Sequence, residues 1–116
     1  MKPTDLMIKD QVRVKVLSQV PNTYVLHTWT ANDYSRDWQV KPIPLTPEIL
    51  EKNGWERNGI FMEKRIDENT HLSWTDICGS VLSQGNYYMC DCNYVHTLQH
   101  ALRLCGFDEL ANNFKI

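Results

Sequence analysis

Hydrophobic and polar residues alternate along residues 11–17. The valines of this segment share one side of an extended chain and are Val12, Val14 and Val16. Arg13 and Lys15 fall on the opposite side, so the alternation predicts a strand with one buried face. Residues 23–29 and 38–40 predict two further short strands, separated by a polar loop. Together these segments predict a small N-terminal β-meander.

A helix start and a helix stop follow in close succession after this meander. Pro42 and the proline two residues later keep the chain extended. Thr46 is a favourable N-cap, and Pro47 occupies the first helical position, where its missing N–H costs nothing. Gly54 supplies a left-handed residue that ends the helix. The pattern predicts a rigid connector followed by a helix over about residues 47–53.

The rest of the chain predicts a second sheet and a C-terminal helix. Asn58-Gly59 is the strongest hairpin signal, because both residues tolerate the positive φ angles of a type I′ turn. Further strands are expected at residues 70–75, 77–82 and 86–92. Asn93 and Gly106 bracket a helix over about 94–105 as its N-cap and its stop, and a last short helix follows Asp108.

These elements predict an α+β fold. Residues 1–44 form a small β lobe, for which an SH3-like barrel is one form of the meander. Residues 45–116 form an α+β lobe in which the helix packs on the second sheet, and both lobes share one compact unit. The residues expected in the core are Val12, Val14, Val16, Leu50, Trp55, Leu98 and Leu102.

Composition and charge narrow the classes of protein to consider. The chain has 116 residues, of which 42% are hydrophobic and 22% charged, as in an ordinary globular domain. Residues 1–44 carry six Lys/Arg against four Asp/Glu, an excess of +2, within a net charge of −2 for the whole chain. This excess is small for a nucleic-acid-binding protein. No apolar stretch approaches a membrane span, and the first residues lack the apolar core of a signal peptide, so a cytoplasmic location is expected.

Two segments of the chain carry a family resemblance, Pro42–Trp55 (PIPLTPEILEKNGW) and Tyr94–Gly106 (YVHTLQHALRLCG). Together with the opening Thr4–Val12, they resemble a family of small uncharacterised proteins of gut Bacteroidales genomes, prophages and mobile elements. Many of these relatives have a glycine-aspartate step before the first strand, where this chain has Lys9-Asp10. The resemblance implies a bacterial or phage origin and a cytoplasmic location, and it implies no activity.

The four cysteines predict buried thiols rather than disulfides or a metal site. They are Cys78, Cys90, Cys92 and Cys105. In a reducing cytosol a buried free cysteine behaves as a small hydrophobic residue. Cys90 and Cys92 with His96 and His100 have the residue types of a zinc site. However, two cysteines two apart on a strand have Cβ atoms about 7 Å apart, too far to share one tetrahedral zinc without a turn. No metal and no cofactor are predicted.

The helix over 94–105 has two unlike sides. At about 100° per residue its apolar stripe consists of Tyr94, Leu98, Ala101, Leu102 and Cys105. His96, His100 and Arg103 fall nearly opposite this stripe, so exposure to solvent is expected. They are either a solvated polar face or a contact for a protein partner or an anion, since imidazolium and guanidinium groups donate to carboxylates and phosphates.

Aromatic and basic residues of the N-terminal lobe give a second candidate site. Its members are Lys9, Arg13, Lys15, Trp29, Tyr34 and Trp38. Small β folds bind single-stranded nucleic acid with such stacking platforms and basic rims. In the alternative interpretation, the tryptophans close the core and the cations solvate an open sheet face. The small basic excess favours that alternative.

Catalysis is not predicted, because the chain contains no glycine-rich phosphate loop, nucleophile elbow or His-Glu-x-x-His pattern. The sequence instead favours a non-catalytic cytoplasmic interaction or accessory protein linked to a mobile element or prophage. Its partner would be an unidentified protein, with no membrane involved. The alternative is a small nucleic-acid-binding protein that uses the N-terminal β lobe. The sequence makes no prediction about oligomeric state.

Overall fold

The structure is a computed structural model that describes residues 5–16, 24–35, 38–77, 79–85 and 87–116. Its two antiparallel sheets and accompanying helices confirm the predicted α+β class. The chain divides into two compact units. Unit 1 comprises Met1–Ile43 and Tyr94–Asn112, and unit 2 comprises Pro44–Asn93 and Asn113–Ile116.

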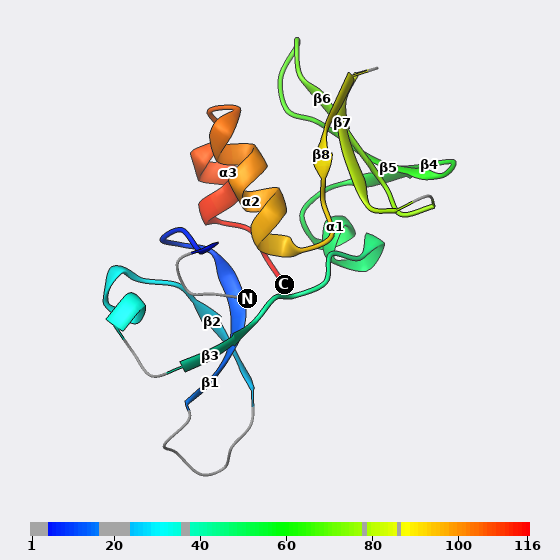
Figure 1. Cartoon of the computed structure of the whole chain (residues 1–116). Coiled ribbons are helices and arrows are strands. Elements are labelled where there is room, and N and C mark those ends of the chain that lie inside the picture. The colour runs from blue at the N-terminus through cyan, green and yellow to red at the C-terminus, as the bar shows by residue number, and fades with distance from the viewer. Residues whose placement is uncertain (1–4, 17–23, 36–37, 78, 86) are drawn as a thin grey trace. The chain divides into compact units, whose positions relative to one another are not determined.

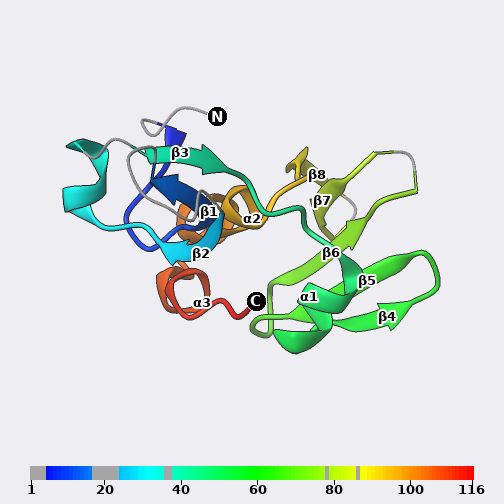
Figure 2. The ribbon, with the colours of Figure 1, turned by 90° about the horizontal axis from the view of Figure 1, so that it is seen from below.

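The sheet of unit 1 has three strands: β1 (Gln11–Val16), β2 (Val25–Thr28) and β3 (Trp38–Lys41). β1 is the central strand and pairs antiparallel with both neighbours, as Figure 2 shows. The three predicted strands are therefore present, but the predicted meander is wrong, because a meander would place β2 in the centre and here β3 pairs with the far side of β1. The polar loop between β2 and β3 contains a short 3₁₀ helix, η2 (Ala31–Ser35). An SH3-like barrel stays a prediction.

The two C-terminal helices, α2 (Val95–Leu104) and α3 (Asp108–Asn112), belong to unit 1 (Figure 1). α2 packs against α3 and β1. Its first N–H, on Val95, donates to the carbonyl of Ile43 at 2.9 Å, which places the helix start beside the end of the N-terminal segment. This differs from the expected packing of α2 on the second sheet. The N-cap also differs, because Tyr94 occupies that position without a side-chain bond.

The inner face of the three-stranded sheet forms an apolar cluster. It contains Leu6, Val12, Val14 and Trp29, with Trp38 and Val40 packed against them. Leu98 and Leu102 of α2 are also buried, so their predicted burial is confirmed together with that of Val12 and Val14. The side chain of Val16 lies outside the described part of the chain. The alternation in the sequence thus identifies the buried side of β1 correctly.

Unit 2 is a five-stranded meander with one short helix. Its strands are β4 (Glu56–Asn58), β5 (Phe61–Arg65), β6 (His71–Thr75), β7 (Val81–Gln84) and β8 (Tyr87–Asp91), in that order across the sheet. The helix α1 (Pro47–Lys52) begins as predicted, with the hydroxyl of Thr46 accepting from the N–H of Ile49 at 3.2 Å. Gly54 has a φ of +83° and ends the helix, and Leu50 and Trp55 are buried as predicted.

The hairpin between β4 and β5 is present, but its turn is displaced by one residue. Asn58 pairs with Phe61, so the two loop residues are Gly59 and Ile60. Gly59 has a φ of +64° at the first loop position, the glycine position of a type II′ turn. The predicted type I′ turn with Asn58 in the loop is wrong, because Asn58 continues the ladder as the last residue of β4.

The described cysteines are buried or half-buried and form no disulfide. Cys92 is fully buried, and Cys90 and Cys105 are half-buried. The Cys92 carbonyl accepts a hydrogen bond from the indole of Trp74 at 2.9 Å, which ties the end of β8 to the core of unit 2. Burial raises the pKa of the Cys92 thiol, so it stays protonated at neutral pH. Cys78 lies outside the described residues.

Candidate functional site

The predicted polar stripe on α2 does not face solvent. His96 is 8% exposed, and His100 and Arg103 have side chains that are 24% and 14% exposed. The expectation of exposure is wrong because this side of the helix packs on the turn before β1. His100 and Arg103 already donate to Asp10 within the molecule.

Asp10 is the centre of this packing. Its carboxylate is fully buried and accepts from His100 Nε2 at 2.5 Å, from an Arg103 guanidinium N–H at 2.6 Å and from the Met7 N–H at 2.8 Å. Next to it, the His96 ring stacks on Tyr94 and meets the His100 ring edge-on, with centroids 5.8 and 5.5 Å apart. The cluster joins residues about 90 positions apart in the sequence.

The electrostatics of this cluster favour a structural role. Burial by itself raises the pKa of Asp10, but hydrogen bonds from His100, Arg103 and Met7 outweigh it and lower that pKa. A carboxylate with a lowered pKa and three donors is a weak general base. Burial, and then the neighbouring His100, lower the pKa of His96. Asp10 therefore acts as a clamp between the turn and α2.

The aromatic residues predicted to stack on nucleic acid lie mainly in the core. Trp29 is fully buried, and Trp38 is half-buried and packs with it edge-to-face at 6.2 Å. Tyr34 is 43% exposed, but its hydroxyl donates to the carbonyl of Leu6 at 2.7 Å and its ring meets Trp29 at 5.6 Å. Lys9 is exposed in the turn before β1. These four residues do not form a stacking platform with a basic rim.

The outer face of the three-stranded sheet has a different composition. The strand register places Arg13 opposite Lys41, and Lys15 opposite Gln39. Arg13 and Lys41 are exposed, and Lys15 is half-buried. The side chains that alternation directs to this face are Gln11, Arg13, Lys15, Tyr24, Leu26, Thr28, Gln39 and Lys41. Three of these described residues are cations and none is acidic. We call this surface the basic sheet face.

Tyr24 is the aromatic residue of the basic sheet face. Lys15 and Lys41 place their ammonium groups over its ring, 5.2 and 5.6 Å from the centroid. Its hydroxyl reaches Gln39 Oε1 on β3 at 3.5 Å, so the side chain extends from the β2 edge across β1. The Tyr24 residue as a whole is 39% exposed. The site therefore combines an accessible aromatic ring with three cations on a rigid sheet.

The alternation in residues 11–17 predicts Arg13 and Lys15 on this face, but the sequence analysis did not place Tyr24, Gln39 and Lys41 there. The missing signal was the alternation of the second and third strands. Because Trp29 belongs to the core, the residues at odd spacing from it, including Tyr24, face outward. In the same way, because the Trp38 side chain faces the core, the side chains of Gln39 and Lys41 face outward.

The surface of the N-terminal lobe is more basic than its residue count indicates. Asp10 and Asp33, two of the four acidic residues in 1–44, are 0% and 2% exposed. Asp33 accepts from His27 Nε2 and from the Thr30 N–H, both at 2.7 Å, while Asp10 is paired with Arg103. The Asp10 charge is therefore paired with a guanidinium inside unit 1, and both carboxylates are buried away from the basic sheet face.

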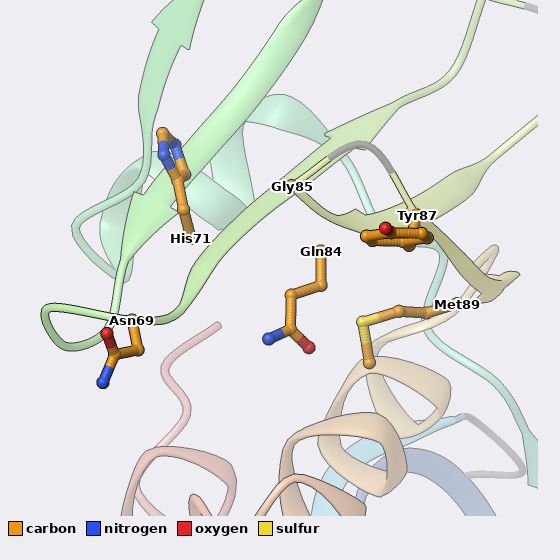
Figure 3. Close-up of a pocket in the computed structure, with 6 residues that line it drawn as sticks. All are labelled: Asn69, His71, Gln84, Gly85, Tyr87 and Met89. Atoms are coloured by element: carbon orange, nitrogen blue, oxygen red, sulfur yellow. The ribbon is translucent and has the colours of Figure 1, made fainter.

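A hollow of about 450 Å³ lies beside β6, β7 and β8 in unit 2 and is lined by Asn69, His71, Gln84, Gly85, Tyr87 and Met89. Figure 3 shows the His71 ring projecting to one side of the strands, while Gln84 and Asn69 extend to the other. His71 Nε2 is also engaged by Glu63 Oε2 at 2.9 Å. Because its polar groups diverge, the hollow lacks the convergent lining of a small-molecule site.

Within the described residues, no group of three or more His, Cys, Asp or Glu side chains is arranged to hold a metal ion. No helix among them is long and apolar enough to cross a membrane. Comparisons with protein-family models, with curated proteins and with solved structures give no match. The basic sheet face is therefore the candidate site that the residues themselves define.

Proposed function

We propose that this chain is a non-catalytic binding protein whose basic sheet face holds an anionic polymer. The observation that carries the proposal is the register of β1 and β3, which places Arg13 directly opposite Lys41. Like charges opposite each other destabilise a sheet by roughly 0.2–1 kcal/mol. Neither cation has an ion-pair partner among the described residues. A bound anion removes this repulsion.

The proposal includes a cytoplasmic location and an accessory role in a mobile element or prophage. Cys92 and Cys105 are free thiols, which is typical of a reducing compartment. The accessory role rests on the resemblance carried by residues 42–55 and 94–106. Binding of an acidic protein at His96, His100 and Arg103 has less support, since Asp10 already engages two of these side chains.

Chromatography on heparin at low salt tests the proposed function. The wild-type protein is expected to be retained and to elute earlier as salt rises, because counterion release gives polyanion binding its salt dependence. The variant Arg13→Gln/Lys15→Gln/Lys41→Gln is expected to lose retention. These side chains are on an open sheet face, so the unfolding transition of the variant should be close to that of the wild type.

A matched control removes three cations from unit 2 instead. Lys52, Arg57 and Arg65 are all exposed, and their change to glutamine alters the net charge by the same amount. If the control variant is retained on heparin and the first variant is not, binding is assigned to the basic sheet face. Equal loss in both variants would show that only total charge matters, and failure of the wild-type protein to bind would overturn the proposed function.

A further inference from the structure

We infer that the polymer bound by the basic sheet face is single-stranded nucleic acid, with Tyr24 as the stacking platform for a base. This inference rests on the proposed function and deepens it. Three features point to it: the accessible Tyr24 ring, the cations around that ring and the open face of a three-stranded sheet.

Two ammonium groups lie over the Tyr24 ring. Lys15 and Lys41 lie over it at 5.2 and 5.6 Å, and these cation–π contacts at an accessible site are weak. Lysine side chains are flexible, so both can leave the ring and reach the phosphates on either side of a base. A base then takes their place on the ring, and base–aromatic stacking is stronger than an exposed cation–π contact.

The surrounding residues fit a nucleotide strand. The three strands are about 4.8 Å apart, so the face is about 10 Å wide between β2 and β3. Arg13 supplies a planar donor that matches phosphate, and Gln39 supplies an amide beside the ring. No carboxylate among the described residues of this face repels the backbone. The site thus has an aromatic ring, cations and an amide within one short stretch.

The shape of the site favours a single strand over a duplex. In a duplex the bases stack on one another, and reading them requires an element that enters a groove. The basic sheet face is formed by β1 with β2 on one side and β3 on the other, so it presents strands and no groove-entering element. A single strand exposes the faces of its bases, which Tyr24 can contact. An acidic peptide offers charge without a series of flat rings.

Fluorescence anisotropy with a labelled single-stranded oligonucleotide of about eight nucleotides tests this inference, a length within the range used by small β folds. The Tyr24→Ala variant is expected to bind roughly 5- to 150-fold more weakly. The Tyr24→Phe variant keeps the ring and loses only a long hydrogen bond, so its affinity should stay within about twofold of the wild type. Three phosphate contacts predict a slope of log K against log salt of about −2.

The competing outcomes are separated by three further probes: a duplex of the same sequence, heparin and poly-glutamate. Weaker binding of the duplex, with heparin retention unchanged by Tyr24→Ala, supports stacking. Equal affinity for single strand and duplex overturns the inference, and so does an unchanged oligonucleotide affinity in Tyr24→Ala. In either case, retention of the wild-type protein on heparin would still support the proposed function. Stronger binding of poly-glutamate than of the oligonucleotide identifies an acidic protein as the partner and overturns the inference as well.

Discussion

At the scale of single residues, Asp10 connects several groups of unit 1 that are far apart in the sequence. Its fully buried carboxylate is held by His100, Arg103 and the Met7 N–H, and its backbone carbonyl accepts from the N–H of Trp29 at 2.7 Å. A buried charge is tolerated only when it is paired and hydrogen-bonded. Asp10 therefore fixes α2 to the start of β1, and it does so independently of the apolar core.

The first prediction concerns the Asp10→Asn variant. The amide cannot balance the charge of Arg103 and presents N–H groups where acceptors are needed, so unfolding should become easier by about 3–5 kcal/mol. Urea denaturation followed by circular dichroism measures this change. Glu68→Gln, at an exposed position, is the matched control and should change stability by less than about 0.5 kcal/mol. A loss below about 1 kcal/mol for Asp10→Asn would contradict the clamp.

The second prediction concerns the dependence of stability on pH. Burial lowers the pKa of His96, so the folded protein binds fewer protons than the unfolded chain below the unfolded pKa of about 6.5. Stability therefore falls as pH drops below about 6.5. His96→Phe keeps a ring to stack on Tyr94 and removes the titration, so its stability should fall less between about pH 7 and pH 5.5.

The measurement is a set of denaturation curves across that pH range for the wild type and for His96→Phe. The groups that act on the charge of His96 are His100, Asp10 and Asp5. The pKa of Asp10 is lowered in the folded protein, so its carboxylate stays ionised in this range. The stability that Asp10 contributes is lost only at more acidic pH, as pH falls through its folded pKa. If Phe is too large for the site, His96→Gln gives the same comparison. Parallel curves would rule out His96 as the source.

At the scale of elements, the turn before β1 shows how local strain is offset. Lys9 has a φ of +76° and is the non-glycine residue with positive φ in the described part of the chain. Its N–H donates to the Trp29 carbonyl at 2.8 Å, and its carbonyl accepts from Gln99 Nε2 at 3.1 Å. These bonds hold a left-handed conformation that costs an ordinary residue about 1–2 kcal/mol.

The third prediction is that Lys9→Gly stabilises the protein. Glycine removes the strain of the left-handed conformation but has more freedom in the unfolded chain, so the net gain should be up to about 1 kcal/mol. Thermal denaturation measures it. Lys9→Ala removes the same charge and keeps the strain, so it should give no gain. A melting temperature that rises equally in both variants would assign the effect to charge.

Local patterns in the sequence predicted most of the elements but not how they pack. The alternation around Val12 and Val14 and the cap at Thr46 depend on nearby residues, and the structure confirms both. The packing of α2 depends on Gln99, whose buried amide bonds Gln11, Lys9 and Ala111. A helical wheel treats such a glutamine as solvent-facing. The sequence carries no local signal for partners about 90 residues away.

The candidate site was only partly predictable for a similar reason. Arg13 and Lys15 follow from the alternation of a single strand, whereas the role of Lys41 requires the register of β3 against β1. The count of charged residues in 1–44 also underestimated the basic character of the surface, because it could not show that Asp10 and Asp33 are buried and paired. Pairing between distant residues therefore changed both the packing of α2 and the judgement of surface charge.

At the scale of the whole molecule, unit 1 is built from two separate segments of the chain. Residues 1–43 supply the sheet, and residues 94–112 supply the helices that cover Asp10. The carbonyl of Ile43 and the N–H of Val95 are hydrogen-bonded at 2.9 Å, so the chain leaves and re-enters the unit at nearly one point. A short linker can join these ends, because about four flexible residues span roughly 10 Å.

The last prediction is that unit 1 folds and binds without unit 2. A chain of residues 1–43 joined to 94–112 through a Gly/Ser linker of about four residues keeps the Asp10 clamp and the basic sheet face, so it should unfold cooperatively and stay on heparin at low salt. Residues 1–43 alone leave the Asp10 carboxylate without His100 and Arg103, and should show no cooperative transition. Urea denaturation and heparin chromatography measure both. A joined chain that folds but is not retained would move the binding site out of unit 1, and one that does not fold would show that unit 2 is required for its stability.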